Sequence, residues 1–194
     1  MLLTEKFKDT TIILASQSPR RKELLAGLGL QFSTISLDID ETFDRNELKK
    51  AQITDYLSAK KAKAYTAIQP NDLIITSDTT VWVDDESLEK ASNREEAYEM
   101  IKKLSGKTHS VYTSVTIRSI KKEVTFSDET QVTFADLTDE EIYFYIDNYK
   151  PFDKAGAYGV QEWIGYIGVD NMNGSYFNVM GLPTHKLYKE LMKF

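Results

Sequence analysis

Two arginines stand at the start of a predicted helix, where the helix dipole favours negative charge. In the stretch LASQSPRRKELL, residues 14–25, Ser18 is a suitable N-cap and Pro19 a suitable first helical residue, and Arg20 and Arg21 follow directly. Backbone N–H groups at a helix start, together with two forked guanidinium groups, suit a phosphate chain. We therefore consider an anion site here, against the alternative of two solvated arginines.

Carboxylates at two other places could act as a base or hold a metal ion. Asp78 lies within the strand-like run LIITSDTTVWV, where an unpaired carboxylate among apolar neighbours would be costly. Asp38, Asp40 and Glu41 end another strand-like run, and hard oxygen ligands of this kind suit Mg²⁺ or Mn²⁺. An ordinary strand-end residue and a surface acidic cluster are the respective alternatives.

Several other chemistries have no support in the sequence. The chain has no cysteine, which excludes a thiol nucleophile, and its two histidines, His109 and His185, lack metal-ligand spacing. Ser16 and Ser18 are not set in a G-x-S-x-G elbow, and neither of the common glycine-rich phosphate loops occurs. Any nucleotide must therefore be held by a different arrangement.

Composition limits the partners and the compartment. The 194 residues carry a formal net charge of -6, which argues against binding to a nucleic-acid backbone. The first residues, MLLTEKFKDT, are charged and contain no apolar run of the length that a signal peptide or a membrane span requires. We expect a soluble, cytoplasmic protein with no membrane contact.

The elements that must position these residues alternate between strand and helix in the first half of the chain and form hairpins in the second. Strand patterns cover residues 10–16, 32–41, 72–85, 109–119, 123–137 and 163–169. Helix patterns follow Ser18 up to Gly29 and cover 47–68, 92–106, 138–149 and 183–194, with capping boxes at Ser92 and Thr138. A glycine-containing loop is expected over 150–163 and a polar turn over 170–175.

This order predicts an α/β fold with a mixed twisted sheet and flanking helices. We expect a single domain over residues 1–194, with two lobes around an active-site cleft.

Taken together, the residues resemble one family, the Maf proteins, which are nucleoside triphosphate pyrophosphatases once described as septum-formation inhibitors. The resemblance covers nearly the whole chain. It rests on the ordered blocks LASQSPRRKELL, DIDE, KKAKAY, SDTTV, LEKA, LSGKTHSVYTSV, DKAGAYGVQ and GSYFNVMGLP. It implies a Maf/Ham1-like fold.

The resemblance also implies an activity and its residues. Family members are metal-dependent enzymes that hydrolyse a nucleoside triphosphate between its α and β phosphates, so a divalent cation, Mg²⁺ or Mn²⁺, is the expected cofactor. Asp78 matches the proton acceptor and Glu41 a carboxylate near the metal, to which Asp78 is an alternative ligand. The residues expected at the phosphates are Ser16, Ser18, Arg21, Lys61 and Lys90.

Three further positions separate the subfamilies. Arg20, Thr79 and Gln161 resemble the set of the dTTP/UTP group. A pyrophosphatase for 7-methyl-GTP or another modified nucleotide, and a nucleotide-binding regulator of cell division, are the alternatives. A homodimer is a family-level expectation.

Overall fold

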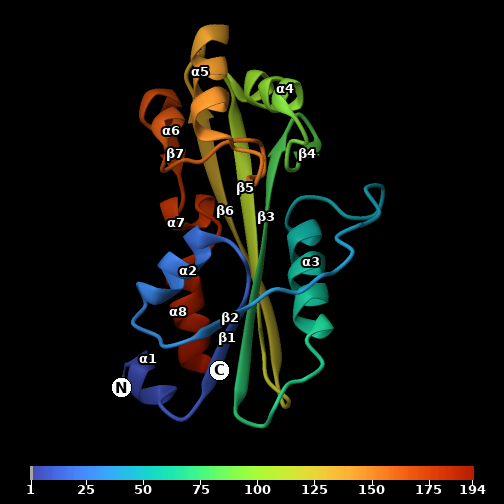
Figure 1. Ribbon diagram of the computed structural model, residues 1–194, viewed down its shortest axis with the longest axis vertical. Coiled ribbons are helices and arrows are strands. Elements are labelled where there is room, and N and C mark those ends of the chain that lie inside the picture. The colour runs from blue at the N-terminus through green and yellow to red at the C-terminus, as the bar shows by residue number, and fades with distance from the viewer. Residues whose placement is uncertain (1) are drawn as a thin grey trace. The chain divides into compact units, whose positions relative to one another are not determined.

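The strands of the chain form one mixed sheet, which confirms the predicted α/β class. The structure is a computed structural model that describes residues 2–194. Over these residues the sheet has seven strands in the order β2-β1-β3-β5-β6-β7, and β4 pairs with β3 (Figure 1). The strands are β1 (Thr11–Ala15), β2 (Ser33–Ile35), β3 (Asp72–Val83), β4 (Glu86–Leu88), β5 (Thr108–Arg118), β6 (Glu123–Phe134) and β7 (Val169–Asn173).

Eight helices accompany these strands in the described part of the chain. They are α1 (Leu3–Lys6), α2 (Pro19–Ala26), α3 (Ala51–Ala64), α4 (Arg94–Leu104), α5 (Asp139–Tyr149), α6 (Trp163–Gly168), α7 (Tyr176–Val179) and α8 (Thr184–Lys193). None of the helices described here has both the length and the apolar character needed to cross a lipid bilayer.

The chain divides into two compact units. The first contains the residues up to Asp78, Thr113–Asp128 and Gly181–Phe194, and the second contains Thr79–Tyr112 and Glu129–Met180. The long strands β3, β5 and β6 therefore contribute residues to both units.

In the first unit, β1 runs parallel to β2 on one side and to the start of β3 on the other. Apolar side chains of β1 and β3, with Ile13 and Ile74 at the centre, pack against Tyr65 and Ile68, which follow α3. Figure 1 shows α2 and α8 on the opposite side of these strands from α3. The β-branched run in residues 10–16 thus forms a buried parallel strand, as its pattern predicts.

Hydroxyl groups join α3 to the sheet. The Thr76 hydroxyl of β3 donates to the Ser58 carbonyl oxygen at 2.7 Å, and the hydroxyls of Thr54 and Ser114 lie 2.6 Å apart. These side chains are buried, so each hydroxyl must find a partner inside the protein. These contacts fix the position of α3 along the strands. Ser58 lies three residues before Lys61, so they also fix where Lys61 lies on the helix.

In the second unit, β4 pairs antiparallel with the end of β3, and β7 pairs antiparallel with the end of β6. Helix α5 begins with the predicted capping box, because Thr138 accepts from the Glu141 N–H and Glu141 accepts from the Thr138 N–H. Its Tyr143 ring stacks on Tyr98 of α4 with centroids 4.6 Å apart.

Three expectations for the second unit are wrong in detail. The apolar run at 163–169 forms helix α6 rather than a strand, and the predicted turn at 170–175 contains strand β7. A short apolar run fits a buried helix as well as a strand, and here Ile164 and Gly168, four residues apart, form the buried face. Helix α4 is capped by Asn93, whose side chain accepts from the Glu96 N–H, rather than by Ser92.

Other elements are shorter than their patterns predict. The helix expected over 47–68 spans Ala51–Ala64, and the strand expected over 32–41 is limited to Ser33–Ile35. Helix α2 ends at Ala26, before Gly29, although Gly29 does adopt a positive φ of 78°. The short helices α1 and α7 have no counterpart among the predicted elements.

Candidate active site

The start of α2 has the predicted geometry. Ser18 is the N-cap and its hydroxyl accepts from the Arg21 N–H at 3.5 Å, while Pro19 occupies the first turn. The Ser16 hydroxyl in turn accepts from the Ser18 N–H at 3.2 Å. Both serines therefore order the backbone at the end of the helix where an anion is favoured.

The side chain of Arg21 is anchored to the C-terminal part of the first unit. Its Nε donates to the carbonyl oxygen of Gly181 at 2.8 Å, and the Ser77 hydroxyl donates to the same oxygen at 3.1 Å. One backbone carbonyl thus ties the arginine of α2 to the residue that precedes Asp78. Gly181 has a φ of 104°, a conformation that favours glycine.

Charges around Arg21 act in both directions on its pKa. Burial lowers the pKa of the guanidinium below its usual value, whereas the carboxylate of Asp78 raises it. Two weaker effects follow, a lowering by Arg20 and a raising by Glu41. Arg20, Asp78 and Glu41 therefore all lie close enough to Arg21 to act on the charge of its guanidinium group.

Lys61 connects the two candidate carboxylates. Its Nζ lies 2.6 Å from Oδ1 of Asp78 and 3.0 Å from Oε1 of Glu41. The Lys61 and Asp78 side chains are 13% and 12% exposed, whereas Glu41 is 48% exposed. The ion pair explains how β3 accommodates a buried carboxylate, since a paired charge avoids most of the cost of an isolated one.

The acidic cluster at 38–41 does not act as a unit. Glu41 contacts Lys61, but Asp40 accepts hydrogen bonds from the Thr42 N–H and hydroxyl, and these bonds lower the pKa of Asp40. Asp38 is exposed. Glu41 is thus the member of this cluster that contacts the Lys61 ammonium.

The donor set can be tested for a divalent cation. Glu41 and Asp78 lie around one ammonium group, and the described residues contain no group of three or more acidic, histidine or cysteine side chains that would form a complete metal cage. Mg²⁺ is commonly held by one or two carboxylates together with phosphate oxygens of the substrate. The two carboxylates fit a cation of that kind.

Three of the predicted residues belong to the second unit. Thr79 follows Asp78 in β3 and is half-buried. Lys90 is exposed, and its backbone forms an antiparallel bridge with Ala155, beside a 3.0 Å hydrogen bond from the Gly156 N–H to the Glu89 carbonyl. The segment that carries Lys90 is therefore attached to the glycine-containing loop.

Gln161 lies in the same loop, directly before Glu162, which is the N-cap residue of α6, and is half-buried. Its neighbour Glu162 accepts from the Tyr145 hydroxyl and forms a 3.1 Å ion pair with Lys154. The sequence did not predict these contacts of Glu162, Tyr145 and Lys154. Charged residues inside an otherwise apolar, glycine-containing loop were the available signal for Lys154 and Glu162.

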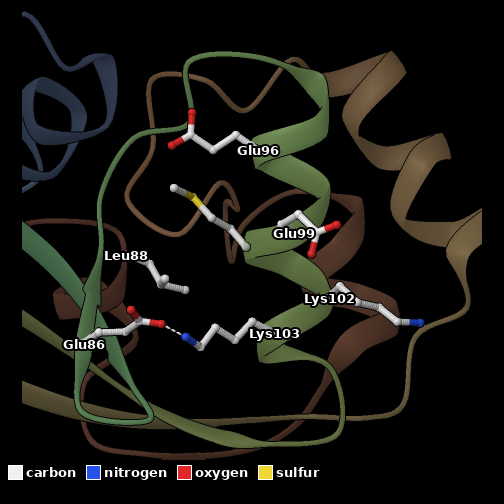
Figure 2. Close-up of a pocket in the computed structure, with 7 residues that line it drawn as sticks. Glu86, Leu88, Glu96, Glu99, Lys102 and Lys103 are labelled. Atoms are coloured by element: carbon white, nitrogen blue, oxygen red, sulfur yellow. Dashed lines mark ion pairs between the residues drawn. The ribbon is translucent and has the colours of Figure 1, made fainter.

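An open pocket in the second unit is separate from all of these residues. It has a volume of about 450 Å³ and lies along β4 and α4, lined by Glu86, Leu88, Glu96, Glu99, Met100, Lys102 and Lys103. Figure 2 shows Lys103 directed toward Glu86, with which it forms an ion pair, and Lys102 directed away from it. None of the predicted site residues lines this pocket, so it is not the candidate active site.

Comparisons with known proteins agree with the resemblance found in the sequence. The family model described as Maf-like protein matches residues 11–194. A protein of Phocaeicola vulgatus named dTTP/UTP pyrophosphatase is 53% identical over 97% of each chain. A protein of Flavobacterium psychrophilum with the same name is 50% identical over 98% of each chain.

Among solved structures, the Staphylococcus aureus Ham1 protein is a distant likeness, with a TM-score of 0.43 and 16% identity. The match covers 66% of this chain and 73% of that one, and it adds nothing to the assignment. The match over nearly the whole sequence and the identity of about half to full-length relatives establish that this chain belongs to the Maf family.

Proposed function

We propose that this protein is a metal-dependent pyrophosphatase that hydrolyses dTTP and UTP between the α and β phosphates and releases the monophosphate and diphosphate. Relatives that share about half of its residues are named dTTP/UTP pyrophosphatases. The observation that carries the proposal is a group of charged side chains in the first unit, in which Lys61 contacts Asp78 and Glu41 and both carboxylates act on the charge of Arg21.

In this proposal the positive groups hold the triphosphate chain. A nucleoside triphosphate carries about four negative charges at neutral pH, and its hydrolysis concentrates charge on the leaving diphosphate. Arg21, fixed by its bond to the Gly181 carbonyl, presents a guanidinium near the start of α2, where the backbone N–H groups also favour an anion. Lys61 and Lys90 would contribute two further ammonium groups.

Asp78 is the proposed proton acceptor. A water molecule would attack the α-phosphorus, its proton passing to an Asp78 carboxylate oxygen, while the bond from the α-phosphorus to the bridging oxygen breaks and diphosphate leaves. The 2.6 Å contact with Lys61 holds the carboxylate in one orientation. The same contact means that the carboxylate and an ammonium group can face the phosphate chain together.

A divalent cation is part of the proposal, with Glu41 as the residue that would hold it and Asp78 as a ligand in the alternative where it is not the proton acceptor. When bound, the cation supplies positive charge against the phosphate oxygens. The chain itself contributes the orientation of the two carboxylates, because both contact the ammonium group of Lys61.

Arg20, Thr79 and Gln161 are the proposed base-selecting residues, and the phosphate-binding set is completed by Ser16 and Ser18. The two serines support the backbone at the start of α2 through their hydroxyls. Arg20 lies two residues after Ser18 and next to Arg21. Separate substitutions of the two arginines would distinguish the role of Arg20 in selection from that of Arg21 in phosphate binding.

We expect residues 1–194 to act as one functional domain in the cytoplasm, because a chain without cysteine needs no disulfide bonds and fits a reducing compartment. The protein is expected to act on nucleotides without nucleic-acid or membrane partners, and to form a homodimer.

The proposal is tested by diphosphate release from purified protein. With Mg²⁺ or Mn²⁺, dTTP and UTP should yield diphosphate and the monophosphate in equal amounts, and removal of the cation with a chelator should stop the reaction. Release of single phosphate groups, or cleavage confined to modified nucleotides such as 7-methyl-GTP, would contradict it.

A further inference from the structure

We infer that Glu162 is a positioning residue that fixes Gln161, and that Lys154 and Tyr145 act through it to set the base selectivity of the enzyme. Tyr145, Lys154, Gly159 and Glu162 are called the Glu162 network below. The inference rests on the proposed function, because it concerns the residue expected to select the base.

The network connects a helix to the glycine-containing loop of the second unit. The Tyr145 hydroxyl, from α5, donates to Oε2 of Glu162 and accepts from the Gly159 N–H at 2.9 Å. The Nζ of Lys154 lies 3.1 Å from Oε1 of Glu162. Both oxygens of one carboxylate are therefore bound, and the hydroxyl group joins that carboxylate to the loop backbone.

The members of the network lie inside the protein. Tyr145 is fully buried, and the side chains of Lys154 and Glu162 are 8% and 20% exposed. Burial and the hydrogen bond to Glu162 both raise the pKa of the Tyr145 hydroxyl, which therefore stays a donor at every physiological pH. A buried ion pair with satisfied hydrogen bonds restricts its partners to one geometry.

Gly159 allows the loop to approach the charged side chains. A Cβ atom at this position would lie 2.8 Å from the Glu162 carboxylate and 3.0 Å from the Lys154 side chain. A larger residue would therefore displace the network. The close approach indicates that the loop and the charged pair occupy one fixed arrangement.

Gln161 lies between two fixed points. On one side, the Gly159 N–H is held by Tyr145, and on the other, the Glu162 carboxylate is held by Tyr145 and Lys154. The Glu162 N–H also donates to the Gly159 carbonyl oxygen at 3.0 Å, which closes a turn around residues 160 and 161. The network therefore determines where the backbone of Gln161 lies, within a turn of two intervening residues.

A network that served stability alone would make a different prediction. Loss of stability lowers the amount of folded enzyme and reduces the measured rate with every nucleotide by the same factor. Displacement of a base-contacting residue changes the ratio of kcat/KM between nucleotides. It leaves kcat for the preferred nucleotide nearly unchanged, because the groups that act on the phosphates stay in place.

The test is the Tyr145→Phe variant, which removes one hydroxyl and keeps the buried ring. We expect the ratio of kcat/KM for UTP over CTP to fall by about tenfold, mainly through KM, with kcat for UTP within about twofold of the parent enzyme. The matched control is Tyr149→Phe on the same helix, whose exposed ring stacks on Tyr145 at 5.2 Å. It should keep the parent ratio.

A second variant and a second measurement test the same inference independently. Lys154→Met should lower the same ratio, and hydrogen exchange of the backbone N–H groups at 159–162 should become faster in both variants than in the parent or in Tyr149→Phe. An unchanged ratio in both variants, or an equal loss with all nucleotides, overturns the inference. If the parent protein cleaves neither dTTP nor UTP, the proposed function fails, and unchanged exchange at 159–162 would separately reject the positioning.

Discussion

Two lysines of this chain each contact two carboxylates, yet their surroundings differ. Lys61 lies between Asp78, which is 12% exposed, and Glu41, which is 48% exposed. Lys154 lies between Glu162, which is 20% exposed, and Asp153, which is 58% exposed. In composition and burial the two clusters are nearly the same.

The difference lies in what else binds the more buried carboxylate. Glu162 receives a neutral hydroxyl from Tyr145, and that hydroxyl is tied to a backbone N–H of the loop. Asp78 lies in the field of Arg21, a second positive group at a helix start. A lysine between two carboxylates thus stabilises a loop in one unit and, in our proposal, forms part of a phosphate site in the other.

The largest expected effect is at Asp78. Asp78→Asn keeps the shape of the side chain but removes the proposed proton acceptor, so we expect kcat to fall by about 1000-fold or more with dTTP and UTP. Diphosphate release measures the loss. Asp72→Asn is the matched control, because Asp72 is a buried carboxylate of the same strand whose contact is the Gln69 N–H, and it should retain parent activity. Equal activity of the two variants would remove Asp78 from the chemistry.

Lys61→Met should have the next largest effect on activity. Loss of the ammonium group leaves the developing charge on diphosphate less well neutralised, and we expect kcat/KM to fall by about 100-fold with every triphosphate. Steady-state kinetics on four nucleotides measure this. Lys63→Met, on the same helix at an exposed position, should behave as the parent does. A loss confined to one base would show that Lys61 acts in selection instead.

Lys154→Met should affect stability more than Lys61→Met does. Lys154→Met leaves Glu162 with the neutral hydroxyl of Tyr145, and breaking a buried pair in this way costs about 3 kcal/mol of the free energy of unfolding. In Lys61→Met the positive charge of Arg21 still acts on Asp78, so the loss should be smaller. Urea unfolding monitored by circular dichroism measures both variants. Equal destabilisation by the two substitutions would break the distinction between the clusters.

The second unit also contains a buried histidine, His109, which should make the stability of the protein depend on pH. Burial lowers the pKa of His109 from 6.5 to about 4, and its Nε2 lies 2.7 Å from the Tyr158 hydroxyl. The unfolded chain binds the proton first, so stability is full above pH 6.5 and is lost as pH falls toward 4. At pH 5 the loss from this group is about 2 kcal/mol relative to pH 7.5.

Urea unfolding of His109→Gln at both pH values tests this. The variant should lose less stability between pH 7.5 and pH 5 than the parent does, because the amide takes up no proton. His185→Gln changes the other, exposed histidine and should leave the parent pH dependence in place. If His109→Gln and the parent lose stability equally over this range, the buried histidine is not the group that responds to acid.

The sequence predicted those parts of the fold that depend on local chemistry. The Ser18-Pro19 start of α2, the Thr138 and Glu141 capping box and the apolar strand β3 each follow from residues within a few positions of one another. Helix α6 was missed because a short apolar run fits a buried helix as well as a strand. A Cβ on Gly165 would lie 1.8 Å from the Val160 carbonyl oxygen, a contact that no periodicity reveals.

The candidate site was predictable to a similar degree. Arg21 and Asp78 were candidates because of their residue types and their positions at a helix start and in a strand. Lys61 was selected only through the resemblance to the Maf family, because a lysine in a polar helix has no signature of its own. The carbonyl of Gly181, which anchors Arg21, is a backbone group without a signature in the sequence. The partnership of Tyr145 with Glu162 joins a helix to a loop 17 residues later, and it depends on how the two pack.

The most direct test of the account compares Lys61→Met and Lys154→Met on UTP and CTP in one diphosphate-release assay. We expect Lys61→Met to lower kcat/KM for both nucleotides by the same factor, and Lys154→Met to change their ratio while kcat for UTP stays nearly unchanged. A changed ratio in Lys61→Met together with an equal loss on both nucleotides in Lys154→Met would contradict it.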